Sequence, residues 1–299
     1  MRASVVIVTY NRLSLLKECL QCVDNQLVKF DDVVIVENCS TDGTIEYLKE
    51  KVDKYHIIFE KENGGGAKGF TDGIAYVHKN IKTDWILLID DDAMLSPNYL
   101  QTLLIAAQKE QSCMAFSGSV MTDGKIDLTH RKRVDNSKTM DFYPVPLKEY
   151  SNDFFYYDLS SFCGLFFAAR LISKIGLPRE DYFIWFDDTE YSLRIRKETA
   201  IKNINGTFIN HKMKKAKSVQ KLNWRGYYGT RNGGDVIRTY GTRKQFQLYV
   251  RRIKIAQYKN LILYCFTLNS EYKYNYKLYR DALNDLSTNK FGFNPLYHA

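Results

Sequence analysis

A short apolar run that ends in three carboxylates restricts the possible folds of this chain more than any other feature. Residues 85–89 (Trp-Ile-Leu-Leu-Ile) are too short for a helix and rich in branched side chains, which predicts a buried parallel strand. Asp90, Asp91 and Asp92 follow directly. Because residues two apart share one face of an extended chain, we expect Asp90 and Asp92 to converge and Asp91 to point away.

These three carboxylates predict a cation site. Adjacent anions at the mouth of a buried strand repel one another unless a positive charge lies among them. Hard oxygen ligands suit Mg²⁺ or Mn²⁺, which takes one or two carboxylates and completes its shell with substrate phosphates. A solvated acidic turn before a helix starting near Ser96-Pro97 is the alternative. The position at the end of an apolar strand favours the metal site.

The N-terminal part alternates between strand and helix patterns. Runs rich in β-branched residues predict strands over 4–10, 32–36, 56–60 and 85–89, with amphipathic helices between them. This alternation indicates a doubly wound, mostly parallel α/β sheet with helices on both faces. Further strands are expected over residues 113–121 and 162–169. Residues 122–158 show no clear period and predict an irregular hairpin or loop, either near an acceptor or as surface decoration.

Polar loops at the carboxyl ends of these strands are expected to form one ligand site, as in other open α/β sheets. The loops are 9–12, 37–40 and 63–69, together with the three aspartates. Glu37 or Asn38 is placed to bond a ribose or a base. The glycines of residues 63–69 permit close approach of a phosphate or sugar to a helix N-terminus. Glycine-rich turns also serve packing, so the combination of loops carries the prediction of a nucleotide site.

A second acidic block, residues 187–190 (Asp-Asp-Thr-Glu), follows the aromatic run 182–186. Carboxylates at a helix N-terminus can simply cap the helix. Aromatic neighbours can also desolvate a carboxyl group and raise its pKa for base catalysis, and aromatic faces suit sugar rings. His211, 23 residues after Asp188, is either a structural histidine or a metal ligand.

The charge of the chain is unevenly distributed. Residues 200–299 hold 19 Lys and Arg against 4 Asp and Glu, whereas residues 1–199 hold 24 basic and 30 acidic residues. A basic C-terminal region could hold nucleic acid, an anionic membrane surface or an anionic substrate, and the acidic remainder makes nucleic acid the weakest of these. The rest of the C-terminal region, including residues 251–254, 261–266 and 272–280, is expected to be helical with mixed aromatic and basic faces. It could form a solvated cap or attach peripherally to an anionic leaflet.

Other features indicate a cytoplasmic protein. No run approaches the ~18 apolar residues of a membrane span, and the N-terminus enters a strand without a signal-peptide layout. Six scattered cysteines suggest a reducing compartment. Cys19 and Cys22 have CxxC spacing, but they fall inside a helical pattern without a second pair, so packing is their expected role.

The loop sequences together resemble those of family 2 glycosyltransferases with the GT-A fold. The resemblance rests on residues 8–12, 37–44 and 90–92 and covers roughly the first 210 residues. Residues 63–70 narrow it to the galactofuranosyltransferase-like branch, with rhamnosyltransferases close by. Two departures occur: Glu37 stands where the family commonly has Asp, and Lys68 interrupts the usual glycine pair and could reach a donor phosphate.

The resemblance implies a GT-A catalytic domain over 1–212 and a basic, Tyr-rich helical region over 213–299. It identifies Asp188 as the catalytic base, with Asp187 and Glu190 as supporting acids. The implied ligands of Mg²⁺ or Mn²⁺ are Asp90, Asp92 and His211. Donor contacts are expected from Thr9, Tyr10, Asn11, Arg12, Glu37, Asn38, Asn63, Gly65, Gly66, Lys68, Asp90, Asp91 and Arg231. Acceptor contacts are expected from Phe162, Cys163, Gly164, Trp185 and Phe186.

The activity implied is inverting, metal-dependent sugar transfer from a nucleotide sugar to a glycan or lipid-linked glycan in bacterial surface polysaccharide synthesis. UDP-galactofuranose is the expected donor, and rhamnosyl transfer from dTDP-rhamnose is the alternative. A nucleotidyltransferase would carry a glycine-rich basic loop after the first strand, where residues 9–12 contain no glycine. A non-catalytic sugar-binding module would not need both acidic blocks.

Overall fold

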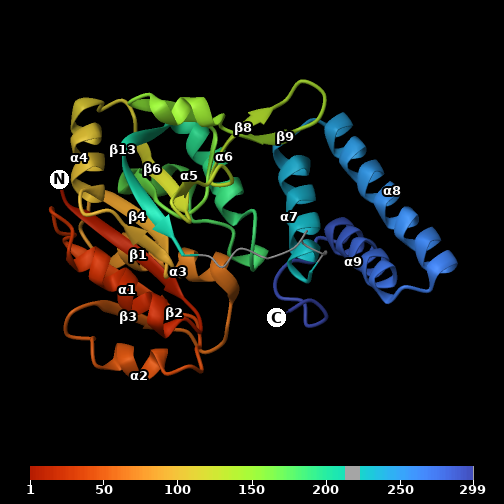
Figure 1. Cartoon of the computed structure of the whole chain (residues 1–299), viewed down its shortest axis with the longest axis horizontal. Helices are drawn as coiled ribbons and strands as arrows, with labels where there is room; N and C mark the ends of the chain where they lie inside the picture. Colours follow the sequence, from red (N-terminus) through yellow and green to blue (C-terminus); the bar gives the residue numbers. More distant parts are fainter. Residues whose placement is uncertain (213–222, 299) are drawn as a thin grey trace.

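The computed structural model describes residues 1–212 and 223–298 and contains one large mixed sheet (Figure 1). Its strand order is β10-β13-β6-β12-β4-β1-β2-β3, with β5 (Ala93–Leu95) paired to β13 and β7 (Lys125–Ile126) paired to β6. The strands in that order are β10 (Phe154–Tyr157), β13 (Ile201–His211), β6 (Ala115–Thr122), β12 (Leu165–Ala168), β4 (Trp85–Asp90), β1 (Ala3–Thr9), β2 (Asp32–Glu37) and β3 (His56–Phe59).

The four strands predicted in the first 90 residues form the parallel half of this sheet. β1 pairs in parallel with both β2 and β4, and β2 pairs in parallel with β3. The other half is mixed, because β12 runs antiparallel between β4 and β6, whereas β13 runs parallel to β6. The carboxyl ends of β1, β2 and β4 therefore meet at one edge, as expected from the sequence.

Helices cover both faces of the sheet, which confirms the predicted fold class. Along β1, Val5 and Ile7 pack on one face while Val6 and Val8 pack on the other, since successive side chains of a strand alternate. The first face is covered by α1 (Leu13–Asp24), α2 (Thr44–Lys49) and α4 (Tyr99–Lys109). The second is covered by α3 (Gly65–Asn80), α5 (Ile172–Ile175) and α6 (Asp187–Glu198), with short turns η2 (Ala169–Leu171) and η3 (Glu180–Tyr182) between them.

The segment predicted to be an irregular hairpin contains a small second sheet. β8 (Arg131–Asp135) lies between β9 (Asp141–Pro144) and β11 (Leu159–Ser160), and η1 (Leu147–Ser151) follows β9. Arg131 is fully buried and donates hydrogen bonds to the carbonyl oxygens of Gly118 and Cys163 at 2.9 and 3.1 Å. This arginine ties the small sheet to β6 and to the loop before β12.

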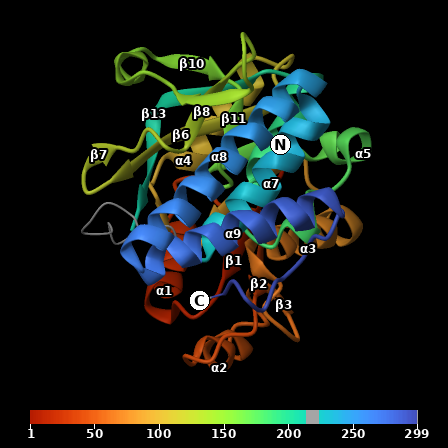
Figure 2. The same ribbon diagram turned by 90° about the vertical axis from the view of Figure 1, so that its right-hand side faces the viewer.

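Three helices form the C-terminal part: α7 (Arg225–Tyr240), α8 (Arg243–Thr267) and α9 (Ser270–Ser287). They lie beyond the carboxyl edge of the parallel strands, with α7 nearest the sheet (Figures 1 and 2). Val236 and Ile237 of α7 share a hydrophobic cluster with Tyr182 and Leu193 of the N-terminal part. The helical extension is thus as predicted, while a domain boundary at residue 212 stays a prediction. Among the residues described, no helix is both long and apolar enough to cross a membrane.

Candidate active site

The acidic cluster lies at the carboxyl end of β4, directly against the last residue of β13. In the β5–β13 pairing, His211 is opposite Ala93, which places its ring beside the preceding residue, Asp92. His211 Nε2 lies 3.1 Å from Asp92 Oδ1, and the backbone N–H of Lys212 donates to the carbonyl oxygen of Asp92 at 2.9 Å. Two residues 119 positions apart are thereby held together by strand register.

Asp91 points away from His211 and toward the end of β1. Its carboxylate accepts a hydrogen bond from Thr9 Oγ1 at 2.8 Å and lies 3.2 Å from Arg12 Nη1. The same Nη1 atom lies 2.5 Å from Asp92 Oδ2. The side chain of Arg12 is 41% exposed, so this guanidinium links two buried carboxylates to the open edge of the sheet.

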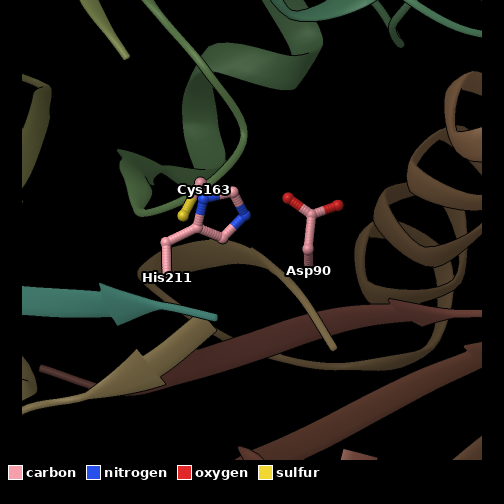
Figure 3. Close-up of side chains that lie close together, drawn as sticks. All are labelled: Asp90, Cys163 and His211. Carbon is pink, nitrogen blue, oxygen red and sulfur yellow. The ribbon is translucent and has the colours of Figure 1, made fainter. Parts of the chain in front are cut away.

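Asp90, Cys163 and His211 form a second set of close groups, with ligating atoms all within 4.8 Å of one another (Figure 3). Cys163 was predicted to contact the acceptor, but its side chain is 1% exposed and lies beside the histidine. Asp127 and His130 approach His211 within the same limit. Neither Asp127 nor His130 was singled out from the sequence, because neither belongs to a recognisable spacing.

The electrostatics of this cluster fit a divalent cation. Burial and the charge of Asp92 raise the pKa of Asp90 to about 7, and burial raises the pKa of Asp91 to about 6. Burial opposes ionisation of Asp92, but contact with His211 outweighs it and lowers the pKa of Asp92. Burial also opposes protonation of His211, yet the neighbouring carboxylates raise its pKa. The buried anions therefore lack sufficient positive charge.

Two orphaned atoms support the same fit. Asp92 Oδ1 and His211 Nδ1 are buried and have no hydrogen-bond partner among the residues that the structure describes. The contact between Asp92 Oδ1 and His211 Nε2 is close, but it lacks hydrogen-bond alignment. Carboxylate oxygens together with an imidazole suit Mn²⁺ better than Mg²⁺, which prefers oxygen ligands alone.

The predicted donor loops contact one another at this edge. Asn38 Oδ1 accepts from the N–H of Gly64, and Asn38 Nδ2 donates to the carbonyl oxygen of Gly65, each at 3.0 Å. Asn63 Oδ1 accepts from the N–H of Gly65 at 2.9 Å. Glu37 is fully buried and accepts from the N–H groups of its own turn at Cys39 and Ser40. These side chains shape the glycine loop.

The remaining predicted donor contacts differ in their exposure. Tyr10 is 41% exposed, and Asn11 has a left-handed backbone (φ 52°) and accepts from the N–H of Thr41. Gly66 has open space around its α-carbon. Lys68 forms ion pairs with Glu60, which follows β3, and with Asp72 in its own helix, α3.

Arg231, also predicted to bind the donor, is 1% exposed and lies inside the protein. Its guanidinium donates to the carbonyl oxygens of Tyr182 and Gly292 at 3.3 and 2.9 Å. Arg231 is therefore part of the packing between α7 and the loop before α6, not of the open edge of the sheet.

The second acidic block begins α6 and follows a strained loop. Phe183, Trp185 and Phe186 have positive φ angles of 65°, 64° and 71°, a conformation that L-residues adopt only when the surroundings impose it. The buried amide of Asn232 in α7 imposes it here. Asn232 Nδ2 lies 3.0, 3.1 and 2.9 Å from the carbonyl oxygens of Tyr182, Ile184 and Trp185.

Two glycines of α7 allow the aromatic rings of this loop to pack closely against the helix. A β-carbon on Gly229 would lie 3.0 Å from the ring of Trp185, and one on Gly233 would lie 2.9 Å from the ring of Phe186. The sequence analysis missed the roles of Asn232 and Gly233. The available signal was the i, i+4 spacing of two glycines inside a helical pattern, which leaves a groove on one face of the helix.

The carboxylates of this block lie in different environments. Burial and the charge of Asp188 raise the pKa of Asp187, and the charge of Asp90 adds to the effect, so the two acidic blocks interact electrostatically. Burial raises the pKa of Asp188, whose Oδ1 accepts from the N–H of Thr189. Glu190 accepts hydrogen bonds from Arg194 at 2.7 Å and from the hydroxyl of Tyr240 at 2.6 Å.

The predicted acceptor contacts divide into exposed and buried residues. Trp185 is 44% exposed and Phe186 is partly buried beside it. Phe162 is 3% exposed and packs its ring 4.7 Å from that of Phe70. Gly164 is left-handed (φ 93°), and a β-carbon there would lie 2.5 Å from the hydroxyl of Tyr99. Of the five, only the two aromatic residues before α6 lie near open surface.

Comparison with known proteins finds a match to the family model described as glycosyl transferase family 2, over residues 4–171. Galactofuranosyltransferase GlfT1 of Mycolicibacterium smegmatis is 25% identical over 204 residues, which are 64% of this chain and 64% of that protein. An uncharacterized glycosyltransferase of Mycoplasma pneumoniae is 27% identical over 75% of this chain and 73% of its own length. Glycosyltransferase GlyA of Streptococcus pneumoniae is 27% identical over 104 residues, and the match spans only 14% of its length.

Two solved structures share the fold. GalNAc-T7, crystallised with UDP, GalNAc and Mn²⁺, superposes with a TM-score of 0.65 at 14% identity, covering 96% of this chain and 57% of that one. TarS of S. aureus, in complex with UDP-GlcNAc, superposes with a TM-score of 0.57 at 16% identity, covering 96% and 80%. At these identities the likeness shows the GT-A fold.

Proposed function

Since this chain belongs to glycosyltransferase family 2, we propose that it transfers a sugar from a nucleotide-sugar donor to a glycan acceptor with inversion at the anomeric carbon. The observation that carries this proposal is the contact of Asp92 with His211 at the carboxyl edge of the sheet, within electrostatic range of a second acidic block. One block holds Asp90 and Asp92 beside His211, and the other holds Asp187 and Asp188.

The first block supplies the donor side of the site. Asp90, Asp92 and His211 would hold the metal, which, when bound, supplies positive charge to the donor diphosphate and the leaving group. Mn²⁺ is supported by the imidazole and by the Mn²⁺ of the GalNAc-T7 structure, and Mg²⁺ is the alternative. Thr9, Asn38 and Arg12 position the loops around the nucleotide.

The second block supplies the acceptor side. An acceptor hydroxyl oxygen attacks the anomeric carbon, the bond from that carbon to the diphosphate breaks, and the hydroxyl proton moves to Asp188. Burial raises the pKa of Asp188 and so makes it a better proton acceptor than an exposed carboxylate. Asp187 and Glu190 hold the start of α6, and the exposed face of Trp185 offers a surface for a sugar ring.

The donor proposed is UDP-galactofuranose, and the acceptor is a glycan or lipid-linked glycan of bacterial surface polysaccharide. Support comes from the relative GlfT1, named as a galactofuranosyltransferase, and from residues 63–70. The UDP ligands of both structural neighbours favour a uridine diphosphate over dTDP-rhamnose. Neither a nucleotidyltransferase nor a non-catalytic sugar-binding module is supported by the family match and the two acidic blocks. We expect this chemistry to take place in the cytoplasm.

A donor panel tests the proposal. The purified protein is incubated with UDP-galactofuranose, UDP-galactopyranose, UDP-GlcNAc or dTDP-rhamnose, with Mn²⁺ or EDTA, and nucleotide release is measured. Release from UDP-galactofuranose alone, and only with metal, is the expected result. Release from dTDP-rhamnose alone would overturn the donor and retain the mechanism, whereas release from no nucleotide sugar in the presence of a glycan acceptor mixture would overturn the function.

A further inference from the structure

One face of α8 carries large apolar side chains that no other part of the described chain covers. Ile255, Tyr258, Ile262 and Phe266 are 60%, 55%, 56% and 85% exposed. They are spaced by three or four residues, so they lie along one side of the helix. Ile255, Tyr258 and Ile262 line an open groove of about 790 Å³ together with the neighbouring Val250 and Leu263, and Phe266 lies one turn beyond Ile262. Single exposed apolar residues are ordinary, but a continuous stripe of this size marks an interaction surface.

Positive charge lies within the same face. Arg251, Lys254 and Lys259 line the groove together with the apolar residues and form no ion pair with any residue in 1–212 or 223–298. The 25 residues of α8 include six Lys and Arg and no Asp or Glu. We use the term α8 face for Arg251, Lys254, Ile255, Tyr258, Lys259, Ile262 and Phe266. An apolar stripe mixed with cations is the composition of helices that lie in the interface of anionic membranes.

We propose that the α8 face docks on the surface of a bilayer that contains anionic phospholipid. The apolar side chains would enter the boundary between headgroups and acyl chains, while the three cations would contact lipid phosphates. A second copy of the chain fits the face less well, because a symmetric contact would bring two sets of these cations together without an acidic residue on α8 to offset them.

The position of α8 relates this docking to the site at the carboxyl edge. α7 lies between α8 and the sheet, and it is α7 that seats the loop before the second acidic block (Figures 1 and 2). Docking through α8 would thus hold the carboxyl edge of the sheet near the lipid, with α7 between the edge and α8. This surface is separate from the residues of the proposed catalytic centre, so its test does not depend on the identity of the donor.

Vesicle cosedimentation of the full chain tests the proposal. Binding is measured on phosphatidylcholine vesicles and on vesicles with about one-third phosphatidylglycerol, at low and high salt. We expect binding to the anionic vesicles only, with release at high salt because exposed charges are screened. The triple variant Arg251→Gln, Lys254→Gln, Lys259→Gln should weaken partitioning on the order of 100-fold, since each cation near an anionic surface contributes about 1 kcal/mol. The double variant Ile262→Ser, Phe266→Ser should weaken it by about 10-fold or more.

Matched controls lie on the opposite end of the molecule. Lys49→Gln, Lys61→Gln, Lys79→Gln removes the same charge from exposed positions, and Leu27→Ser, Val52→Ser removes exposed apolar side chains of 65% and 54% exposure. Both control variants should bind like the parent chain. The thermal unfolding midpoint reports folding and should be unchanged in all four variants. Absence of parent binding, or equal losses in the α8 and control variants, would overturn the proposal. So would a dimer in solution that the α8 variants dissociate, together with unchanged vesicle binding.

Exposed Cys265, beside Phe266, allows a second measurement. In a Cys22→Ser, Cys39→Ser background, a polarity-sensitive fluorophore on Cys265 should shift to the blue with anionic vesicles and not with phosphatidylcholine. An unshifted fluorophore on a protein that still sediments with the vesicles would show that another surface binds the lipid.

Discussion

The backbone of Gly65 passes so close to the carbonyl oxygen of Phe183 that a β-carbon on Gly65 would lie 2.0 Å from that oxygen. The N–H of Ala67 also donates to this oxygen, at 3.2 Å. The start of α3 therefore touches the strained loop before the second acidic block, so the glycine loop and this strained loop constrain each other directly.

Gly65→Ala should destabilise the protein by about 2 kcal/mol or more and remove most turnover. Both the left-handed backbone (φ 79°) and the contact with Phe183 exclude a side chain. Gly66→Ala is the matched control, because nothing lies within 4 Å of a β-carbon there. We expect it to keep the parent thermal midpoint. Thermal unfolding and nucleotide release check both variants, and a stable, active Gly65→Ala protein would contradict the prediction.

Asp92→Asn should weaken donor binding in the presence of Mn²⁺ by ~10- to 100-fold or more. Loss of a side chain that only supports a metal ligand already weakens metal affinity by this factor. The reason is the loss of the carboxylate beside His211. Calorimetric titration with UDP in Mn²⁺ and in EDTA measures the effect. Asp91→Asn is the control, because Asp91 faces Thr9 instead, and its metal dependence should be retained. Equal Mn²⁺-dependent affinity in the parent and Asp92→Asn proteins would remove Asp92 from the metal site.

Asp188→Asn should keep donor affinity and lose turnover by ~10²-fold or more, the scale for removing a positioned base. Asp187→Asn is the paired variant, and a smaller loss is expected from it. Single-turnover kinetics with saturating donor separate the chemical step from binding. The reverse order of the two losses would transfer the role of base to Asp187, whose pKa responds to Asp90.

The pH dependence of stability should also reveal Asp187. Its pKa is raised in the folded protein, so between the ordinary carboxyl value and the raised value the unfolded chain has released a proton that the folded chain still holds. Stability contributed by this group is therefore lost as pH rises through that window. At pH 8, Asp187→Asn should raise the free energy of unfolding by on the order of 1 kcal/mol, as is common when an unfavourable functional group is removed. Near pH 3, the free energy of unfolding should be unchanged. Urea unfolding at both pH values measures this, and an equal gain at both would exclude titration of Asp187.

Asn232→Asp should lower turnover by about 10-fold or more while donor affinity changes little. The substitution keeps the shape of the side chain but removes the N–H donors to the carbonyl oxygens of Tyr182, Ile184 and Trp185. Leaving buried acceptors unpaired costs about 1–3 kcal/mol. The fluorescence of Trp185 reports displacement of the loop. Asn260→Asp on α8 is the control, since Asn260 donates only within its own helix. Unchanged turnover and fluorescence in Asn232→Asp would show that the loop holds itself.

Sequence patterns were sufficient for the parallel half of the fold. Branched apolar runs located β1, β2, β3 and β4 within one or two residues, because a strand buried on both faces has few other compositions. The acidic block indicated the start of α6. The helical ranges expected over 251–254 and 261–266 belong to the single helix α8, 272–280 lies in α9, and α7 was not predicted as a separate helix. The sequence patterns missed β13, whose residues 201–211 mix polar and apolar side chains irregularly around a bulge.

The missed strand explains why the candidate site could be predicted only in part. Asp90, Asp91 and Asp92 lie at the end of one strand. Strand geometry alone predicts that Asp91 points away from the side shared by Asp90 and Asp92. The position of His211 depends on the register of β13 against β5, and that of Cys163 on the antiparallel entry of β12 beside β4. Lys68 and Arg231 are predicted phosphate contacts whose charges the fold directs to protein partners.

The sequence by itself therefore determined the kind of sheet, the edge at which the candidate site lies and the acidic residues at that edge. Periodicity and strand ends are properties of short segments, so the residues of one segment are sufficient to predict them. Only the tertiary structure decided that His211 faces Asp92, that Asn232 holds the loop before Asp187, and that the α8 face remains open. Each of these relationships joins or separates segments far apart in the chain, and strand order, register and helix packing set which side chains meet.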